Sequence, residues 1–383
     1  MLKKILLLCL CFSYILYSGC FHAQTLWIGI AEDQSSSLAK ISKELDQGRK
    51  LTMQLLSHKD ANNQVFRLKS IDTINNPEKT ANAFRILIDQ HQVKVLLGVP
   101  STECAQIAKH IAEARSIPFI CNAYDATISE DMNQVTVFRQ NPIQLGQLTA
   151  LYFFYVMKKN RLSVLYDEAL QATFQSAKGF LEEGRLIGAT MIEETFSSYD
   201  RPADWQVKWS RLHSAQPEVI LIAADPSHYR DLLTIAKQVL MVPAIFVLHH
   251  QPQKEDLLEH PTLFENIYIL TPFYEQKPLF SKSSFFQQYI QRFNEAPSYY
   301  SAQGHDEIML LYEIQKKRNH LALNERFSSM EGFIPERDLY FTGFRGFMTN
   351  SLSMNDIDVL KVQDNAIEYL GAFWMEILSK GGQ

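Results

Sequence analysis

Long apolar runs are nearly missing from this sequence. The one that exists, residues 5–17 near the N-terminus, is too short for a membrane span, which excludes a polytopic membrane protein. Basic residues are not in excess, since the formal net charge is −5, and this argues against nucleic acid as a partner. Cysteine is scarce, with five in 383 residues, so the chain is not a disulfide-stapled miniprotein.

Motifs of common enzyme classes are missing as well. The chain has no G-x-G-x-x-G, G-x-S-x-G or H-E-x-x-H pattern, which are typical of dinucleotide-binding, hydrolase and zinc-protease sites. His249 and His250 are adjacent at the end of an expected strand, where neighbouring side chains point to opposite faces. We therefore expect one cleft histidine instead of a metal chelate. The sequence predicts no catalysis, no cofactor and no metal site.

The N-terminal segment is typical of an export signal, with two lysines, an apolar stretch and small residues before Cys20. Two cleavage sites are open. The end of the segment resembles a lipobox, in which residues 1–19 are removed and Cys20 is lipidated, although Tyr17 stands where that pattern usually has Leu. The alternative is ordinary cleavage near Ala23. We expect an exported protein in the periplasm or cell envelope, anchored by lipid at Cys20.

Removal of residues 1–19 and lipidation of Cys20 would leave two cysteines with free thiols, Cys104 and Cys121. An exported protein meets an oxidising environment, in which disulfides persist. The two cysteines could form a disulfide bond or remain as two buried thiols, and the sequence leaves both alternatives open.

The rest of the chain alternates short apolar segments with amphipathic ones. Residues 26–31, 93–99 and 217–225 are typical of buried strands, whereas residues 305–318 have the apolar spacing of a helix. This alternation occurs twice, with the second set beginning near Asn141. Because 383 residues exceed what one core usually organises, we predict an α/β fold with two lobes, each a doubly wound parallel sheet.

The order of particular motifs carries a family resemblance. They are IGIA, DTINNPEKTANAFRILIDQHQVKVLLGVPST, IPFICNAYDAT, VFRQNP, LSVLYDEA, PEVILIAAD, ILTPF and FTGFRGFMT. Over residues 26–373 the chain resembles the type I periplasmic binding proteins, specifically the leucine/isoleucine/valine-binding protein branch. The resemblance implies three crossovers between the lobes, near residues 138–141, 269–273 and 341–344. The first lobe would then hold residues 26–139 plus 272–341, and the second lobe 140–271 plus 342–383.

The resemblance also implies a ligand between the lobes, outside the carboxyl ends of the strands. Thr102 matches the family position whose hydroxyl binds the ligand's carboxylate, at a helix start with free amides. Helix capping by Ser101 or Thr102 is the alternative role, and both can hold. Asp125 stands where the family usually has a Thr. Its alternative role is to cap the short helix that follows. The residues that we expect to bind ligand are Ser101, Thr102, Ala123, Tyr124, Asp125, Asp225 and His249.

In the second lobe, Asp225 and His249 each fall near a ligand-binding position of the family, but neither has the residue type that is usual there. The resemblance therefore supports the fold more strongly than it supports the family's ligand. We predict a solute-binding protein that captures an amino acid or a small amide-like solute for an ABC importer. Its expected partners are the solute and an ABC permease, with membrane contact only through the lipid anchor. The alternatives are a sensory or regulatory protein of the same fold, or an envelope interaction scaffold with an unused cleft.

Overall fold

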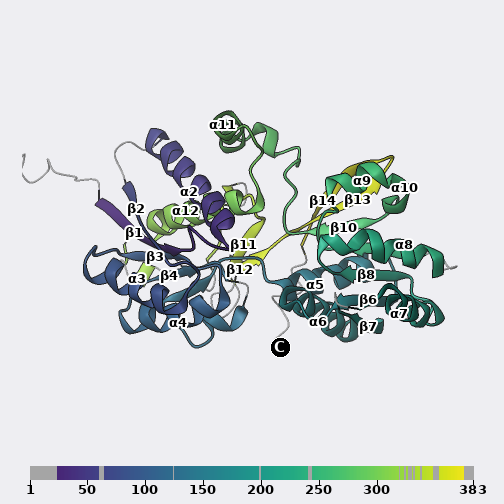
Figure 1. Ribbon diagram of the computed structural model, residues 1–383. Helices are drawn as coiled ribbons and strands as arrows, with labels where there is room; N and C mark the ends of the chain where they lie inside the picture. Colours follow the sequence, from purple (N-terminus) through teal and green to yellow (C-terminus); the bar gives the residue numbers. More distant parts are fainter. Residues whose placement is uncertain are drawn as a thin grey trace, which may run out of the picture.

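The computed structural model has two α/β lobes side by side, joined by strands and loops that run between them (Figure 1). The predicted α/β fold class is confirmed. None of the helices in the described part of the chain has the length and hydropathy to span a bilayer. The residues that the structure describes are 24–59, 64–123, 125–197, 200–239, 244–318, 320–322, 325–326, 330, 333–336, 339–347 and 353–374.

The first lobe is built on a five-stranded sheet with the strand order β2-β1-β3-β4-β5 and all pairs parallel. Its elements are β1 (Gln24–Glu32), α2 (Ala39–Lys59), β2 (Gln64–Asp72), α3 (Pro77–Asp89), β3 (Val95–Gly98), α4 (Thr102–Ala114), β4 (Phe119–Cys121), the 3₁₀ turn η1 (Ala126–Ser129) and β5 (Val135–Val137). Later in the chain, η4 (Phe280–Lys282), α11 (Ser284–Phe293), α12 (Tyr299–Lys317) and the hairpin β11 (Phe344–Phe347) and β12 (Ser353–Asn355) complete this lobe.

The second lobe is built on a seven-stranded sheet with the order β14-β13-β10-β9-β8-β6-β7. Its elements are α5 (Pro142–Leu151), the π-helical η2 (Tyr152–Val156), β6 (Arg161–Asp167), α6 (Gln171–Leu186), β7 (Thr190–Phe196), α7 (Pro202–Ser214), β8 (Val219–Ala223), η3 (Pro226–His228), α8 (Tyr229–Val239), β9 (Ile245–Leu248), α9 (Lys254–Glu259), α10 (Pro261–Phe264), β10 (Tyr268–Thr271), β13 (Ile357–Gln363) and β14 (Ala366–Phe373). This sheet is not purely parallel as predicted, because β13 and β14 form an antiparallel hairpin at one edge.

The inner strands of each sheet, such as β3 and β8, are buried on both faces, which explains why they are continuously apolar. In β3, Leu97 packs with α12 on one face, whereas its neighbour Leu96 packs with α3 and α4 on the other. In β8, Leu221 packs in one hydrophobic core and its neighbour Ile222 in another, on the opposite face of the sheet. Such strands read as apolar runs without alternation.

Cys104 and Cys121 both lie in the first-lobe core and are free thiols. Of the two alternatives that the sequence left open, the structure therefore has the buried thiols. Burial raises the pKa of the Cys121 thiol to about 12, so it stays protonated at neutral pH and is a poor nucleophile.

The chain crosses between the lobes three times. The first crossover follows Phe138, which packs in the first-lobe core, and the second follows Thr271 at the end of β10. The sequence places the third near residues 341–344, and this is wrong. Phe344 and Phe347 still pack against Phe138, with ring centroids 4.9 and 6.2 Å apart. The chain enters the second sheet only after Asn355, because the hairpin β11–β12 covers the first-lobe core.

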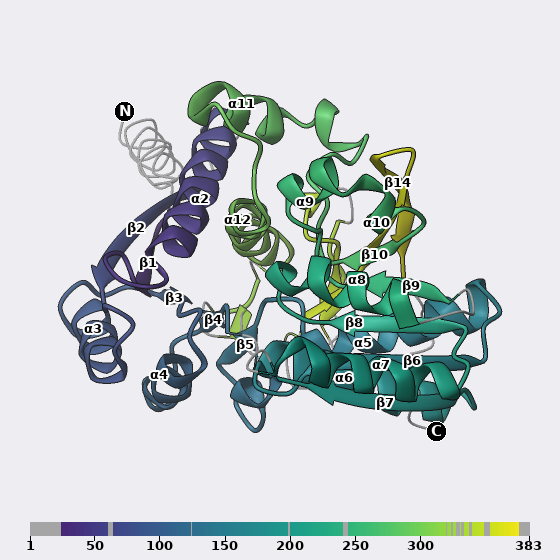
Figure 2. The ribbon, with the colours of Figure 1, turned by 45° about the vertical axis from the view of Figure 1, so that its right-hand side comes forward.

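Helices α2 and α12 touch backbone to backbone through glycine (Figure 2). A Cβ atom on Gly48 would lie 2.0 Å from the Ser301 carbonyl oxygen. This contact sets Arg49 between two buried acids, with Nε donating to Glu307 at 2.6 Å and Nη2 to Glu32 at 2.7 Å. Burial raises the pKa of Glu32 despite its bond to Arg49.

Replacement of Gly48 by alanine should therefore force the two helices apart. We expect Gly48→Ala to lower the free energy of unfolding by at least about 3 kcal/mol, the upper range for overpacking. The control is Gly188→Ala, where no atom lies within 4 Å of the added Cβ but φ is +85°. We expect this variant to lose about 1 kcal/mol of unfolding free energy, from backbone strain alone. Urea unfolding measures both. Equal losses for the two variants would contradict the close contact.

Candidate functional site

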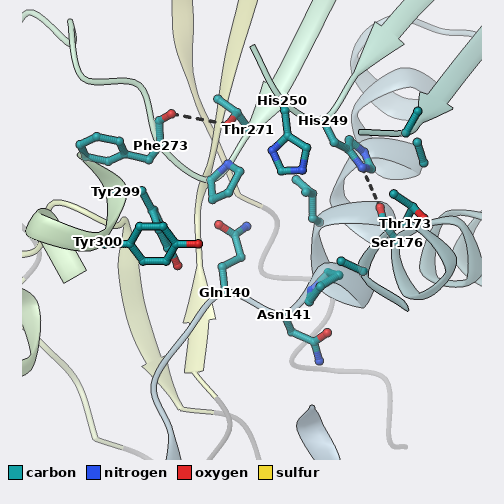
Figure 3. Close-up of a pocket in the computed structure, with 16 residues that line it drawn as sticks. Gln140, Asn141, Thr173, Ser176, His249, His250, Thr271, Phe273, Tyr299 and Tyr300 are labelled. Carbon is teal, nitrogen blue, oxygen red and sulfur yellow. Dashed lines mark hydrogen bonds between the residues drawn. The ribbon is translucent and has the colours of Figure 1, made fainter. Parts of the chain in front are cut away.

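A cavity of about 270 Å³ lies between the lobes, at the carboxyl ends of three parallel strands of the second sheet. Figure 3 shows it in close-up. Its walls combine residues of the first two crossovers, of α5 and α6, and of the start of α12. The lining residues are Gln140, Asn141, Pro142, Leu145, Ala172, Thr173, Ser176, Ala223, Ala224, His249, His250, Thr271, Pro272, Phe273, Tyr299 and Tyr300.

The strand ends and one helix start bring these residues together. β8 ends at Ala223, β9 leads into the two histidines, and β10 ends at Thr271. From the first lobe, α12 begins at Tyr299. Polar side chains at the carboxyl ends of parallel strands meet at one edge of the sheet, which is where α/β proteins bind small molecules.

His249 is held by two hydroxyl groups. Its Nδ1 lies 2.7 Å from Ser176 Oγ and its Nε2 lies 3.1 Å from Thr149 Oγ1. The Thr149 hydroxyl donates its proton to the Leu145 carbonyl at 2.7 Å, so it accepts from Nε2–H. The neutral ring then accepts at Nδ1 from Ser176. Burial lowers the pKa of His249 to about 3, so the ring stays neutral at physiological pH.

The two hydroxyls reach His249 because α5 and α6 cross in close contact. A Cβ on Gly146 would lie 2.0 Å from the Ser176 carbonyl oxygen, and one on Gly179 would lie 2.1 Å from the Ile143 carbonyl oxygen. The Ser176–His249 pair has the spacing of a nucleophile and its base. A ring whose pKa is about 3 does not take up a proton near pH 7, so the pair fixes the cavity wall.

Gln140 is a buried polar side chain of the cavity whose bonding is incomplete. It is 4 % exposed, and neither its amide oxygen nor its amide nitrogen has a hydrogen-bond partner among the described residues. In Figure 3 its amide points into the space between the two tyrosines and His250. A buried amide without partners costs free energy.

Next to it, Arg139 fastens the first crossover. Its guanidinium donates to the Asn122 carbonyl at 3.0 Å and to the Tyr300 hydroxyl at 3.1 Å. Its carbonyl accepts a 2.8 Å bond from Ser353 of β12. Gln140 therefore sits on a segment whose backbone is anchored to the first lobe.

The predicted first-lobe residues that the structure describes lie at the carboxyl edge of the first sheet and do not line this cavity. Ser101 occupies the N-cap position of α4, but its side chain makes no capping bond, and Thr102 is the first residue of α4. Ala123 is fully buried. Asp125 does cap η1, because its Oδ1 accepts bonds of 2.9 and 2.8 Å from the amide and hydroxyl of Thr127.

Of the other predicted residues, His249 lines the cavity. Asp225 follows Ala224 at its margin, and its Oδ1 accepts from the amide and hydroxyl of Ser227 at 2.9 and 2.6 Å. These bonds lower the pKa of Asp225. Tyr124 lies outside the described residues. Ligand binding by the predicted residues stays a prediction.

The expectation of a single cleft histidine is wrong, because His250 lines the cavity together with His249. Both follow Leu248, the last residue of β9, so the alternation of a strand no longer applies to them. No group of three or more potential metal ligands occurs in the described part of the chain.

Sequence reasoning missed Gln140, Thr271, Tyr299 and Tyr300. The first two lie at crossovers that the sequence did locate, so a search for polar residues at crossovers would have found them. The tyrosines lie at the start of α12, six residues before the start expected at residue 305.

A family model described as periplasmic binding protein matches residues 25–331. The chain belongs to this family. The predicted resemblance is thereby confirmed, and membership of the periplasmic binding proteins implies an exported protein. No curated protein matches the chain.

Solved structures are similar to this periplasmic binding protein over 91% of its length. An ABC transporter substrate-binding protein from Sphaerobacter thermophilus has a TM-score of 0.71 and 16% identity, covering 91% of this chain and 98% of that one. A leucine-binding protein from Thermotoga maritima has a TM-score of 0.63 and 16% identity, and the match covers 91% of this chain and 98% of that one. A solute-binding protein from Rhodopseudomonas palustris in complex with 3,4-dihydroxybenzoic acid has a TM-score of 0.66 and 18% identity. The match covers 91% of this chain and 97% of that one. At these identities the likeness shows the two-lobed fold.

The buried, neutral His249 should make stability depend on pH. Its folded pKa is about 3, below about 6.5 for an unfolded histidine, so below pH 6.5 the unfolded chain binds a proton that the folded protein does not. Stability is then lost as pH falls. Between pH 7 and pH 5 we expect wild type to lose about 2 kcal/mol more than His249→Gln.

Urea unfolding at both pH values measures this difference. Exposed His91 provides the control, and His91→Gln should keep the wild-type pH dependence. Parallel pH dependence of wild type and His249→Gln would show that His249 is not held neutral.

Proposed function

We propose that this protein captures a small solute between its lobes and delivers it to an ABC permease. The observation that carries the proposal is the cavity that second-lobe strand ends form with the start of α12 from the first lobe. A solute there contacts both lobes, so its binding favours the arrangement that brings them together. The names of the similar structures, which are ABC transporter substrate-binding proteins, support delivery to an importer.

The second part of the proposal concerns the class of the solute and the loops that contact it when the lobes close. We place an amino acid or a small amide-like solute in the cavity, with the first-lobe loops of Ser101, Thr102, Ala123 and Asp125 approaching it as the lobes close. Asp225 lies at the second-lobe margin. The protein binds and releases its solute without chemical change, since the hydroxyl–imidazole pair of the cavity is a positioning pair.

Closure can be measured in solution. A thermal-shift screen against amino acids, amines and amides should find solutes that stabilise the protein, by about 2.7 kcal/mol at a hundredfold excess over the dissociation constant. X-ray scattering with such a solute should then give a smaller radius of gyration, while circular dichroism shows unchanged helix content. Superimposable scattering curves with a saturating, verified solute would refute closure, and a screen without any stabilising solute would refute capture.

We also propose that the protein is anchored to the membrane by lipid on Cys20, which lies outside the described residues. Cys20→Ser should move it from the membrane fraction to the soluble fraction, or leave its signal uncleaved, because the thiol that takes the lipid is lost. Cys11→Ser, a change within the same signal, should leave both properties unaltered. Normal processing and membrane association of Cys20→Ser would exclude the anchor.

A further inference from the structure

We infer that the group of the solute that enters the cavity is an uncharged amide. The inference rests on the proposed solute capture and names the class of solute that the cavity selects. Three features of the lining carry it: the amide of Gln140, the charge of the walls and their shape.

The first feature is the bonding capacity of Gln140. Its side chain is 4 % exposed and offers one acceptor oxygen and one donor nitrogen, both without partners among the described residues. A carboxylate only accepts and an ammonium only donates, so either group alone would leave one of the two atoms unpaired, and both groups together would bring two charges to the cavity. A second amide can satisfy both atoms at once.

The second feature is that the walls lack formal charge. None of the lining residues in the described part of the chain is Asp, Glu, Lys or Arg. His249 is neutral, since its pKa is about 3, and desolvation also lowers the pKa of His250. Two charged side chains next to lining residues are bonded to neutral groups: Arg139 donates to the Tyr300 hydroxyl, and one oxygen of Asp225 accepts from the Ser227 hydroxyl. A buried ion that finds no partner pays its full desolvation cost.

The third feature is the shape of the cavity. Aromatic rings of Phe273, Tyr299 and Tyr300 line one side, as Figure 3 shows. Small side chains of Ala172, Ala223 and Ala224 line other parts of the wall. Aromatic faces pack well against a flat group, and an amide is planar.

Two kinds of solute carry such a group. One is a simple amide. The other is an amino acid with an amide side chain, whose charged head would lie outside the cavity, toward the first-lobe loops. Benzamide represents the first kind and glutamine the second. Each has a carboxylate of nearly the same shape for comparison, benzoate and glutamate.

Isothermal titration of the purified protein at pH 8, where free histidine is neutral, tests the inference with these four probes. Within at least one pair, we expect the amide to bind at least about tenfold more tightly than its carboxylate, the effect of one unpaired polar group. The pair that shows the preference tells which kind of solute the cavity takes. The inference would be overturned if neither amide binds more tightly than its carboxylate, or if none of the four probes binds.

Gln140→Leu should reduce the preference for the amide to about threefold or less, because it removes both bonding atoms. Gln206→Leu, on the exposed face of α7, is the matched control and should keep the preference. An unchanged preference in Gln140→Leu would also overturn the inference. If other solutes close the lobes while both amides fail, the inference is wrong but solute capture stands.

Discussion

The close crossing of α5 and α6 at two glycines is the contact on which the binding cavity depends. Any side chain on Gly146 or Gly179 would overlap the backbone of the facing helix. Because the helices touch, Ser176 and Thr149 reach the two ring nitrogens of His249. The two hydroxyls fix the imidazole and burial keeps it neutral, so a residue that often carries charge at a binding site serves here as an uncharged wall.

The crossovers supply the rest of the cavity. Gln140 belongs to the segment that leaves the first lobe, and the next residue, Asn141, caps α5 by accepting from the Ile143 amide at 2.8 Å. The first crossover is bonded to β12, the strand that leads into the third crossover, since Ser353 donates to the Arg139 carbonyl. A solute bonded to Gln140 therefore acts on the segment about which the lobes would move. This arrangement joins binding to closure without a separate relay.

The fold could be predicted from the sequence because its signal is local. Residues such as Leu96 and Leu97 are both buried, on opposite faces, and produce the apolar run of a covered strand. The third crossover could not be located this way. Phe344 and Phe347 lie in a strand pattern that fits either lobe, and only their packing against Phe138 decides between the two.

The site was less accessible to sequence reasoning. His249 was found from its place at a strand end, whereas Gln140 and Tyr300 lie on a crossover and at a helix start. Such residues have no periodicity, and their importance comes from the burial and the neighbours that tertiary structure gives them. The family resemblance pointed to the first-lobe loops that follow β3 and β4. Ser101 and Asp125 there hold N-cap positions and Thr102 begins α4, and none of the three lines the cavity.

The most direct test of solute capture at the crossovers is a crystal structure of the protein with the tightest-binding solute of the screen. The account predicts a solute between the lobes, with a donor and an acceptor atom within hydrogen-bond distance of the Gln140 amide and with Tyr299 or Tyr300 against it. A solute bound to the Thr102 and Asp125 loops with Gln140 still unpaired would contradict it.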